Sequence, residues 1–223
     1  MNYFSIGNNP SIEKIKFIYS SKKEKINLRL EEFGKIWAEG TDKEIFAELI
    51  FCILTPQASG KSCWAAVENM IRKDILYRGD RGQISKEIKG ARFINKKAAY
   101  IIEAREKFLG NDETTSLRSI ISKINDGYRA RDWLVNNIKG VGYKEASHLL
   151  RNIGFERNLA ILDRHILKNL HLVGALESIP NSMSKRRYFD IEKKMLEFSR
   201  VIGIPISHLD FVMWYKETGE IFK

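Results

Sequence analysis

The sequence is poor in cysteine. Cys52 and Cys63 are the two cysteines among its 223 residues, too few for a four-cysteine iron–sulfur cluster or zinc site, or for a disulfide scaffold. Both lie within apolar stretches, where thiols are usually buried rather than metal-bound. Any catalytic chemistry is therefore expected to proceed without an iron–sulfur centre, and no metal site is predicted.

Long apolar runs and targeting signals are also missing. No stretch approaches the ~20 apolar residues that cross a bilayer, and residues 1–10 lack the charged-then-apolar pattern of a signal peptide. The hydrophobic share of 43% and the charged share of 30% are typical of a globular protein. We therefore expect no membrane partner and a cytoplasmic, nucleoid-associated location.

Negative charge is in deficit. The 38 lysines and arginines outnumber the 28 aspartates and glutamates, which gives a formal net charge of +10. Lysine and arginine gain affinity for a phosphate backbone by releasing its condensed counterions. The excess favours a polyanionic partner such as nucleic acid, although a basic protein without such a partner would have the same charge.

The sequence is rich in helical periodicity, with no convincing alternating strand. Thr41 and Glu44 have the spacing of a capping box, in which each side chain accepts a hydrogen bond from the other residue's backbone. The stretch 45–54 that follows is apolar on almost every side of a helix, which predicts a buried central helix.

Further helices follow from the same periodicity and from glycine and proline stops. A helix over 61–72 is expected to face inward through Trp64, Val67 and Ile71. The others are predicted at 95–109, 116–125, 132–138, 144–153, 163–170, 184–199 and 207–217. The fold class predicted is therefore all-α, with roughly ten helices.

Two of these helices, 132–138 and 144–153, are joined by a short turn with two glycines. Gly140 and Gly142 allow the backbone to turn sharply and to approach a ligand without a Cβ in the way. Free N–H groups in such a turn, at the start of a helix, are suited to a phosphate oxygen. A Gly-x-Gly turn alone fits an ordinary helix–helix corner equally well.

The turn and the start of the next helix read Ile138-Lys139-Gly140-Val141-Gly142-Tyr143-Lys144-Glu145-Ala146. This run resembles the hairpin of the helix-hairpin-helix DNA glycosylases, the superfamily that contains endonuclease III. The resemblance implies that Lys144 is a nucleophile with Asp163 as its partner. It also implies DNA contacts by Lys139 and by the backbone of Gly140, Val141 and Gly142, and allows a monovalent cation at the hairpin with no other cofactor required.

The resemblance implies a covalent mechanism. Lys144 would attack C1′ of the damaged nucleotide to form a Schiff base, and β-elimination would make the enzyme an AP lyase as well. Asp163 has two compatible roles. It is the expected N-cap of the helix that begins at Arg164, and its carboxylate could stabilise positive charge that develops on the sugar.

Four further segments narrow the resemblance to one branch of the superfamily. They are Lys144 to Asn152 with Ala160 to His165, the run Arg92-Phe93-x-Asn95-x-Lys97-Ala98, and the C-terminal stretch 209–223 with its final lysine. These segments resemble the archaeal-type 8-oxoguanine DNA glycosylases, a branch without an iron–sulfur cluster. The resemblance implies excision of 8-oxoguanine by base flipping, which costs a few kcal/mol of unstacking.

The same resemblance supplies candidates for base recognition. Phe93 and Trp214 would stack on the two faces of the flipped purine. Because 8-oxoguanine has an N7–H donor that guanine lacks, a fixed acceptor facing N7 would select it. The C-terminal carboxylate of Lys223 is such an acceptor. Asp210 is a candidate for a different reason: it lies within one helical turn of Trp214 and could accept from the Watson–Crick edge of the purine.

One loop departs from the archaeal-type pattern. The run Leu54-Thr55-Pro56-Gln57-Ala58-Ser59 looks more like the endonuclease III loop, whose glutamine enters the gap left by the extruded base. Gln57 is a candidate for that role here. An endonuclease III-like enzyme for oxidised pyrimidines is thus one alternative, opposed by the missing cysteines. A non-catalytic helix-hairpin-helix module that only binds DNA is another, opposed by the presence of both Lys144 and Asp163.

The resemblance also implies an architecture. Two helical subdomains would hold double-stranded DNA with an oxidised base in the cleft between them. We expect one subdomain to span 41–157 and to end with the helix-hairpin-helix, and the other to combine 1–40 with 158–223. Lys144 and Asp163 would then lie on opposite sides of the junction. A monomer is expected.

Overall fold

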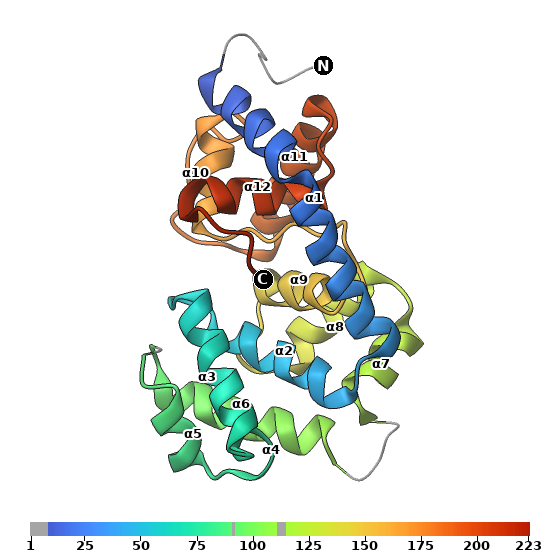
Figure 1. Ribbon diagram of the computed structural model, residues 1–223, viewed down its shortest axis with the longest axis vertical. Coiled ribbons are helices and arrows are strands. Elements are labelled where there is room, and N and C mark those ends of the chain that lie inside the picture. The colour runs from blue at the N-terminus through green and yellow to red at the C-terminus, as the bar shows by residue number, and fades with distance from the viewer. Residues whose placement is uncertain (1–8, 91, 111–114) are drawn as a thin grey trace. The chain divides into compact units, whose positions relative to one another are not determined.

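The computed structural model describes residues 9–90, 92–110 and 115–223, and it consists of helices joined by loops and turns (Figure 1). In these residues no strand is present. The helices are α1 (Pro10–Glu39), α2 (Asp42–Leu54), α3 (Gly60–Arg72), α4 (Ile75–Arg78), α5 (Arg81–Glu87), α6 (Ile94–Phe108), α7 (Leu117–Ile124), α8 (Gly127–Asn137), α9 (Tyr143–Asn152), α10 (Arg164–Leu172), α11 (Lys185–Ile202) and α12 (Ile206–Thr218). The predicted all-α class is confirmed.

The chain forms two compact units. One contains residues 34–155, and the other combines 1–33 with 156–223. The sequence-based division placed the corresponding boundaries at 40/41 and 157/158. In the structure the first boundary, between residues 33 and 34, falls inside α1, which is a single helix from Pro10 to Glu39. This boundary therefore does not coincide with the end of a helix.

Helix α2 is the centre of the unit 34–155. Its capping box is formed: the Glu44 N–H donates to Thr41 Oγ1 at 3.2 Å, and the Thr41 N–H donates to Glu44 Oε2 at 2.6 Å. Every residue from Ile45 to Leu54 is buried, because α3, α6, α7 and α9 all pack against this helix. The predicted buried central helix is confirmed, and it needs apolar residues on all sides for this reason.

The inward face of α3 differs in part from the prediction. Cys63, Val67 and Met70 are its buried residues, at the spacing of one helical stripe. Ile71, one position beyond Met70, lies at the edge of that stripe and is 36% exposed. The prediction that Ile71 faces inward is therefore wrong, while that for Val67 is confirmed.

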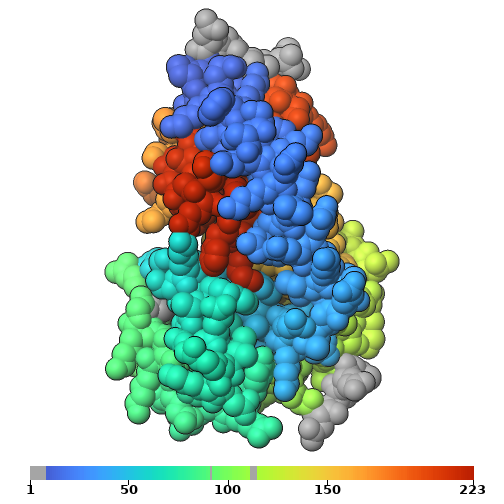
Figure 2. Space-filling view, in the orientation of Figure 1, coloured from blue at the N-terminus to red at the C-terminus, as the bar shows by residue number. Residues whose placement is uncertain are grey.

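The second unit is built from α10, α11, α12 and the first part of α1. Helix α12 packs against α10 and α11. It also lies beside α1, where the Phe211 and Phe33 rings stack at 6.3 Å and the Lys22 ammonium lies over the Tyr215 ring. Figure 2 shows this neighbourhood on the surface, with α12 in red beside α1 in blue. Helix α12 is thus in contact with three helices of its own unit, α1, α10 and α11.

Two expectations from composition can be compared with the structure. Cys52 and Cys63 are both free and buried, as expected. Burial raises the pKa of each thiol above its ordinary value, so neither is suited to act as a thiolate nucleophile. Within the described ranges, no helix has the length and apolar character needed to span a membrane.

Candidate active site

The predicted helix-hairpin-helix is present in the unit 34–155. Helices α8 and α9 pack against each other, and residues 138–142 form the turn between them. Gly140 has a φ of +83°, in the left-handed region, and a Cβ there would lie 2.6 Å from the Tyr100 ring. Glycine is therefore required at this position both by the backbone conformation and by the close approach of Tyr100.

The expectation of free N–H groups in the turn is wrong for two of them. The Val141 N–H donates to the Ile138 carbonyl at 3.3 Å, and the Gly142 N–H donates to Glu145 Oε2 at 3.1 Å. Glu145 thus caps the helix that it belongs to. The N–H groups left for a phosphate are those of the first turn of α9, from Tyr143 onward, which lack an intrahelical partner by helix geometry.

Lys139 lies on the exposed side of the hairpin. Its Nζ is 3.0 Å from Glu103 Oε2, and its side chain is 65% exposed. Ion pairs between exposed side chains contribute little to stability. Lys139 can therefore exchange this carboxylate for a phosphate at small cost.

Lys144 occupies the second position of α9, and its amine is held by one hydrogen bond and one ion pair. Its Nζ donates to Thr55 Oγ1 at 3.1 Å and lies 3.4 Å from Glu145 Oε1. The Lys144 side chain is 21% exposed and that of Glu145 is 14% exposed. The amine is thus largely withdrawn from solvent, beside the hairpin, with its position defined by two polar contacts.

The loop after α2 brings Thr55 to this amine. Thr55 is the C-cap residue of α2, and its hydroxyl donates to the Cys52 carbonyl at 2.9 Å. The two carbonyls that flank it, of Leu54 and Pro56, accept hydrogen bonds from Lys97 Nζ at 2.6 and 2.9 Å. Lys97 comes from α6 and is 5% exposed. The loop is therefore fixed to the core at the point where it contacts Lys144.

Gln57 lies further along the same loop, exposed, in a strained backbone conformation. Its φ is +58°, which non-glycine residues adopt rarely and at a cost of about 1–3 kcal/mol. Its side-chain oxygen accepts a hydrogen bond from Arg92 Nη1 at 2.6 Å. The exposure of Gln57 is compatible with its predicted role of entering the duplex.

Phe93 begins α6 with the same unusual backbone. It is the N-cap residue, with a φ of +59°, and its side chain is 60% exposed. A phenylalanine that contributed to the core would be buried, so packing does not account for this side chain. An exposed aromatic ring on a strained backbone is the feature expected of a residue that stacks on a ligand.

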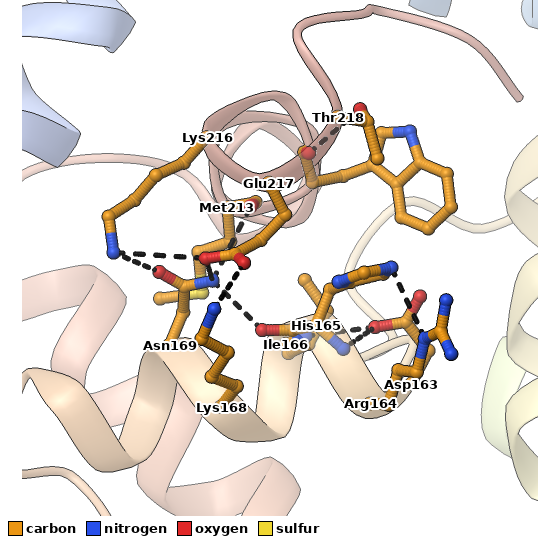
Figure 3. Close-up of polar contacts among 11 residues, drawn as sticks. Asp163, Arg164, His165, Ile166, Lys168, Asn169, Met213, Lys216, Glu217 and Thr218 are labelled. Carbon is orange, nitrogen blue, oxygen red and sulfur yellow. Dashed lines mark hydrogen bonds and ion pairs between the residues drawn. The ribbon is translucent and has the colours of Figure 1, made fainter.

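Asp163 lies in the second unit, at the start of α10. Its Oδ1 accepts hydrogen bonds from the N–H groups of His165 and Ile166, both at 2.8 Å (Figure 3). The predicted N-cap is therefore confirmed. Its Oδ2 takes part in neither of these bonds, so that capping leaves one carboxylate oxygen available for a second role.

Trp214 lies on α12, next to the start of α10. The edge of the His165 ring meets its indole ring, with centroids 4.9 Å apart and an interplanar angle of 85°. Because the backbone N–H of the same His165 donates to Asp163, one residue contacts both the aspartate and the tryptophan. The structure thus brings Asp163 and Trp214 together within one unit.

A polar network centred on Asn169 links α10 to α12 (Figure 3). Asn169, which is fully buried, donates to Glu217 Oε1 at 3.1 Å and accepts from Lys216 Nζ at 2.8 Å. Glu217 also pairs with Lys168 at 2.6 Å. Burial alone would raise the pKa of Glu217, but hydrogen bonds from Lys168 and Asn169 and the positive charges of Lys168 and Lys216 outweigh it and lower that pKa.

The other two base-recognition candidates are also in this unit. Asp210 lies one helical turn before Trp214 on α12 and is buried, with 7% exposure. Lys223 is partly buried at the end of the chain. Neither position by itself assigns a role, so both residues stay candidates.

A metal-binding cluster does not emerge from the part of the chain that the structure describes: no group of three or more His, Cys, Asp or Glu side chains is placed to hold a metal ion. His148 packs edge-on against Phe51 in the core at 5.4 Å. His165 packs against Trp214, as described above. Local packing thus accounts for both histidines near Lys144 and Asp163 in the sequence.

Comparison with known proteins identifies the family. Residues 26–204 match the 8-oxoguanine DNA glycosylase family, and the chain is 40% identical to the 8-oxoguanine DNA glycosylase/AP lyase of Fusobacterium nucleatum over 96% of its length and 99% of the relative's. The chain belongs to the 8-oxoguanine DNA glycosylase family. Another relative of the same description, from Methanocaldococcus jannaschii, is 35% identical over 95% of this glycosylase and 99% of its own length.

Solved structures of the family have the same fold as this glycosylase. The 8-oxoguanine glycosylase/lyase of M. jannaschii, in complex with a 15mer DNA containing 8-oxoguanine, matches with a TM-score of 0.85 and 33% identity, over 95% of this chain and 99% of that one. The 8-oxoguanine DNA glycosylase of Thermotoga maritima matches with a TM-score of 0.84 and 30% identity, over 95% and 98%. The predicted family and fold are therefore confirmed.

The family assignment decides between the alternatives that the sequence left open. The region that matches the family, 26–204, includes the loop with Gln57. This glycosylase therefore belongs to the 8-oxoguanine family although that loop resembles the one of endonuclease III. The residue roles are a separate question. They stay predictions for Lys144, Asp163, Phe93 and Trp214.

Sequence reasoning missed three polar residues around the candidate nucleophile of this glycosylase. Thr55 and Lys97 lie in runs that were compared with the family, but nothing in their spacing indicated contact with Lys144 or with the loop. Glu145 could have been found, because a glutamate at the N3 position of a helix commonly accepts a hydrogen bond from the N-cap N–H, here that of Gly142.

Proposed function

We propose that this glycosylase excises 8-oxoguanine from double-stranded DNA and cleaves the resulting abasic site as an AP lyase. Its family and the activity named for its full-length relatives support this function. The observation on which the chemistry depends most is the Lys144 amine, which is partly buried directly after the hairpin and held by Thr55 and Glu145.

Binding would begin with the phosphate backbone. Lys139 and the N–H groups at the start of α9 would bind a phosphate next to the damage without reading sequence, and the turn of Gly140, Val141 and Gly142 would let the DNA backbone approach them closely. The damaged nucleotide must then leave the duplex. Gln57 would occupy the gap, because it is exposed on a loop that is fixed to the core through Lys97.

The covalent step uses Lys144 as the nucleophile. A bond forms between its neutral Nζ and C1′ while the bond from C1′ to the base breaks, and the electron pair leaves with the base, which takes up a proton. The sugar ring then opens to a Schiff base. Loss of a C2′ proton expels the 3′ phosphate by β-elimination, and water releases the sugar fragment and restores Lys144. Every step balances without an oxidant, a reductant or a metal ion.

Asp163 would act on the sugar rather than on the base. Its Oδ1 is engaged by two backbone N–H groups, which fixes the carboxylate and leaves Oδ2 outside these bonds. A fixed negative charge stabilises the positive charge that develops on C1′ as the glycosidic bond breaks. Asp163 would thus be both a helix cap and a charge stabiliser.

Base recognition would combine stacking with one selective hydrogen bond. Phe93 and Trp214 would stack on the purine, with Asp210 accepting from its Watson–Crick edge. The terminal carboxylate of Lys223 would accept from N7–H, which guanine lacks. A monovalent cation bound by hairpin carbonyls and a monomeric state are part of the same proposal.

The role of Lys223 makes a prediction about the chain end. Residues added after Lys223 convert its carboxylate into a peptide group, so we expect the excision of 8-oxoguanine to fall more than cleavage at a preformed abasic site, by about tenfold. The measurement is the ratio of the two single-turnover rates. An N-terminal extension of equal length is the control, and an unchanged ratio in the C-terminally extended protein would rule out this role.

The proposed function is tested with a panel of duplexes. The full chain is incubated with duplexes that carry 8-oxoguanine, thymine glycol or an abasic site, and strand cleavage is followed on denaturing gels. We expect cleavage at 8-oxoguanine and at the abasic site, with thymine glycol slower by about tenfold or more. Faster cleavage at thymine glycol would support the endonuclease III-like alternative, and binding without any cleavage would support a non-catalytic module.

A further inference from the structure

The Lys144 amine donates a hydrogen bond to Thr55 and forms an ion pair with Glu145, and both of these side chains are themselves fixed. Thr55 Oγ1 is 3.1 Å away and Glu145 Oε1 is 3.4 Å away. The second oxygen of Glu145 accepts from the Gly142 N–H at 3.1 Å, so the hairpin holds this carboxylate. All of these residues belong to the unit 34–155, which makes the arrangement a property of a single unit.

Thr55 can only accept a hydrogen bond from the amine. Its one hydroxyl proton is donated to the Cys52 carbonyl at 2.9 Å, which leaves the oxygen lone pairs for Lys144. This donation has a cause in the sequence. In a regular helix the Cys52 carbonyl would accept from the N–H of residue 56, but residue 56 is proline and has none. The Thr55 hydroxyl replaces the missing donor.

Lys97 fixes the backbone on both sides of Thr55. Its Nζ donates to the carbonyls of Leu54 and Pro56, at the C-terminal end of α2, where carbonyls lack intrahelical partners and the helix dipole attracts a cation. A buried ammonium is costly without such partners. Burial and the nearby positive charge of Lys144 lower the pKa of Lys97. A lysine at a buried site thus serves to hold the loop.

We propose that Thr55 is a catalytic residue of the reaction assigned above, on which this inference rests, and that it aims the lone pair of the Lys144 amine at C1′. A neutral primary amine has two N–H donors and one lone pair in a tetrahedral arrangement. When Thr55 accepts one N–H group and the nearby Glu145 carboxylate attracts the other, the lone pair points in the one remaining direction. Lys97 is a positioning residue that acts through Thr55.

The arrangement also assigns a direction to proton loss. In the ammonium form a third N–H occupies the direction that the lone pair takes in the neutral amine. Loss of this third proton to water leaves the lone pair in the same direction, so that no rotation of the side chain is needed between deprotonation and attack. Such a fixed geometry is the condition for a high effective concentration of the nucleophile.

The test uses Thr55→Val, which keeps the shape of the side chain and removes the acceptor. We expect single-turnover cleavage of the 8-oxoguanine duplex, and borohydride trapping on an abasic duplex, to slow by about tenfold or more. The dissociation constant for DNA is expected to stay within about twofold, because Thr55 contacts the nucleophile and not the phosphate. Thr55→Ser, which keeps the hydroxyl, should restore the rate to within about threefold of wild type.

A comparison in a Pro56→Ala protein separates the proposed role of Thr55 in the reaction from its contribution to stability. Thr55→Val also leaves the Cys52 carbonyl without its donor, which is expected to lower the melting temperature. Pro56→Ala supplies an N–H for that carbonyl, so Thr55→Val is compared with Thr55 in a Pro56→Ala protein. The rate loss should persist in this pair while the melting temperatures agree. A rate loss that disappears there, or one that Thr55→Ser shares, overturns the proposal.

The part played by Lys97 is tested with a double-mutant cycle. If Lys97 acts through Thr55, Lys97→Met slows the reaction in wild type but changes little once Thr55 is valine. Losses that multiply in the double variant overturn this part of the proposal. Wild-type protein that neither cleaves nor traps any duplex overturns the proposed function itself, whereas an active wild type with an equally active Thr55→Val variant overturns only the role of Thr55.

Discussion

At the scale of single residues, Asp163 combines two roles that different substitutions separate. Its Oδ1 caps α10 through the N–H groups of His165 and Ile166, and its charge is proposed to stabilise the sugar. Asparagine caps a helix about as well as aspartate does. Asp163→Asn is therefore expected to lower stability by less than about 1 kcal/mol while it slows 8-oxoguanine excision by about a hundredfold or more.

The companion variant is Asp163→Ala, which loses the cap as well. We expect it to lower the free energy of unfolding by a further ~0.5–2 kcal/mol. Its excision rate should be no higher than that of Asp163→Asn. Urea unfolding and single-turnover rates of both variants are the measurements. Excision by Asp163→Asn at the wild-type rate would mean that the residue is a cap and nothing more.

Two other residues show what the sequence could not reveal at this scale. Gln57 and Phe93 both have positive φ, although neither is glycine, and no sequence rule assigns that conformation to them. Both side chains are exposed. They were selected by resemblance alone, and the strained backbones now add an independent physical reason to regard them as functional positions.

At the scale of helices, local signals predicted most of the fold. The capping box at Thr41 and the apolar run after it identified α2, and the glycine turn at 140–142 separated α8 from α9. The short helices α4 and α5 were not predicted, because four and seven residues are too few to establish a period. The buried face of α3 was predicted to include Ile71, which is exposed. Hydrophobic periodicity locates a buried face only to within about one residue, so it could not distinguish Ile71 from its buried neighbour Met70.

Contacts between distant residues explain the rest of what sequence analysis missed. Thr55 and Lys144 are 89 residues apart, and Asn169 and Glu217 are 48 apart. Side chains so separated meet only because whole helices pack, and periodicity within one helix carries no information about its neighbour's register. The candidate nucleophile was therefore predicted by its motif, whereas the residues that position it were not.

The network between α10 and α12 predicts a pH dependence of stability. The pKa of Glu217 lies below its ordinary value of 4.5, so the folded state favours the charged form. A carboxyl group of this kind contributes stability above pH 4.5, and this contribution is lost as the pH falls through the lowered pKa. Glu217→Gln should thus be less stable than wild type by about 1–3 kcal/mol near neutral pH, with a difference that shrinks below pH 4.5.

Urea unfolding of both proteins over a range of pH measures this difference. Glu13→Gln is the control, because Glu13 pairs with Lys16 at an exposed site and such pairs contribute little. A stability difference between Glu217→Gln and wild type that grows on acidification would have the wrong sign for a lowered pKa and would contradict the description of the network.

At the scale of the whole molecule, the net charge of +10 makes DNA binding dependent on salt. Each phosphate that a lysine or arginine neutralises releases condensed counterions. Lys139 is exposed, and its partner Glu103 is also exposed, so that a phosphate can replace the carboxylate. Lys139→Gln should reduce the slope of log K against log salt by about one.

The matched control is Lys73→Gln, since Lys73 also pairs with a glutamate, Glu87, at 2.7 Å in the same unit but lies outside the hairpin. Its slope should equal that of wild type. Fluorescence anisotropy with a labelled duplex over a series of salt concentrations gives both slopes. Equal slopes for Lys139→Gln and wild type would remove Lys139 from the DNA contact.

The central claim is that Lys144 forms a covalent bond with the DNA. Borohydride is added during cleavage of an 8-oxoguanine duplex, and the trapped complex is digested with a protease and analysed by mass spectrometry. We expect the sugar remnant to be attached to Lys144, and Lys144→Gln to bind the duplex without being trapped. A remnant on a different lysine, or undiminished trapping by Lys144→Gln, would contradict the central claim.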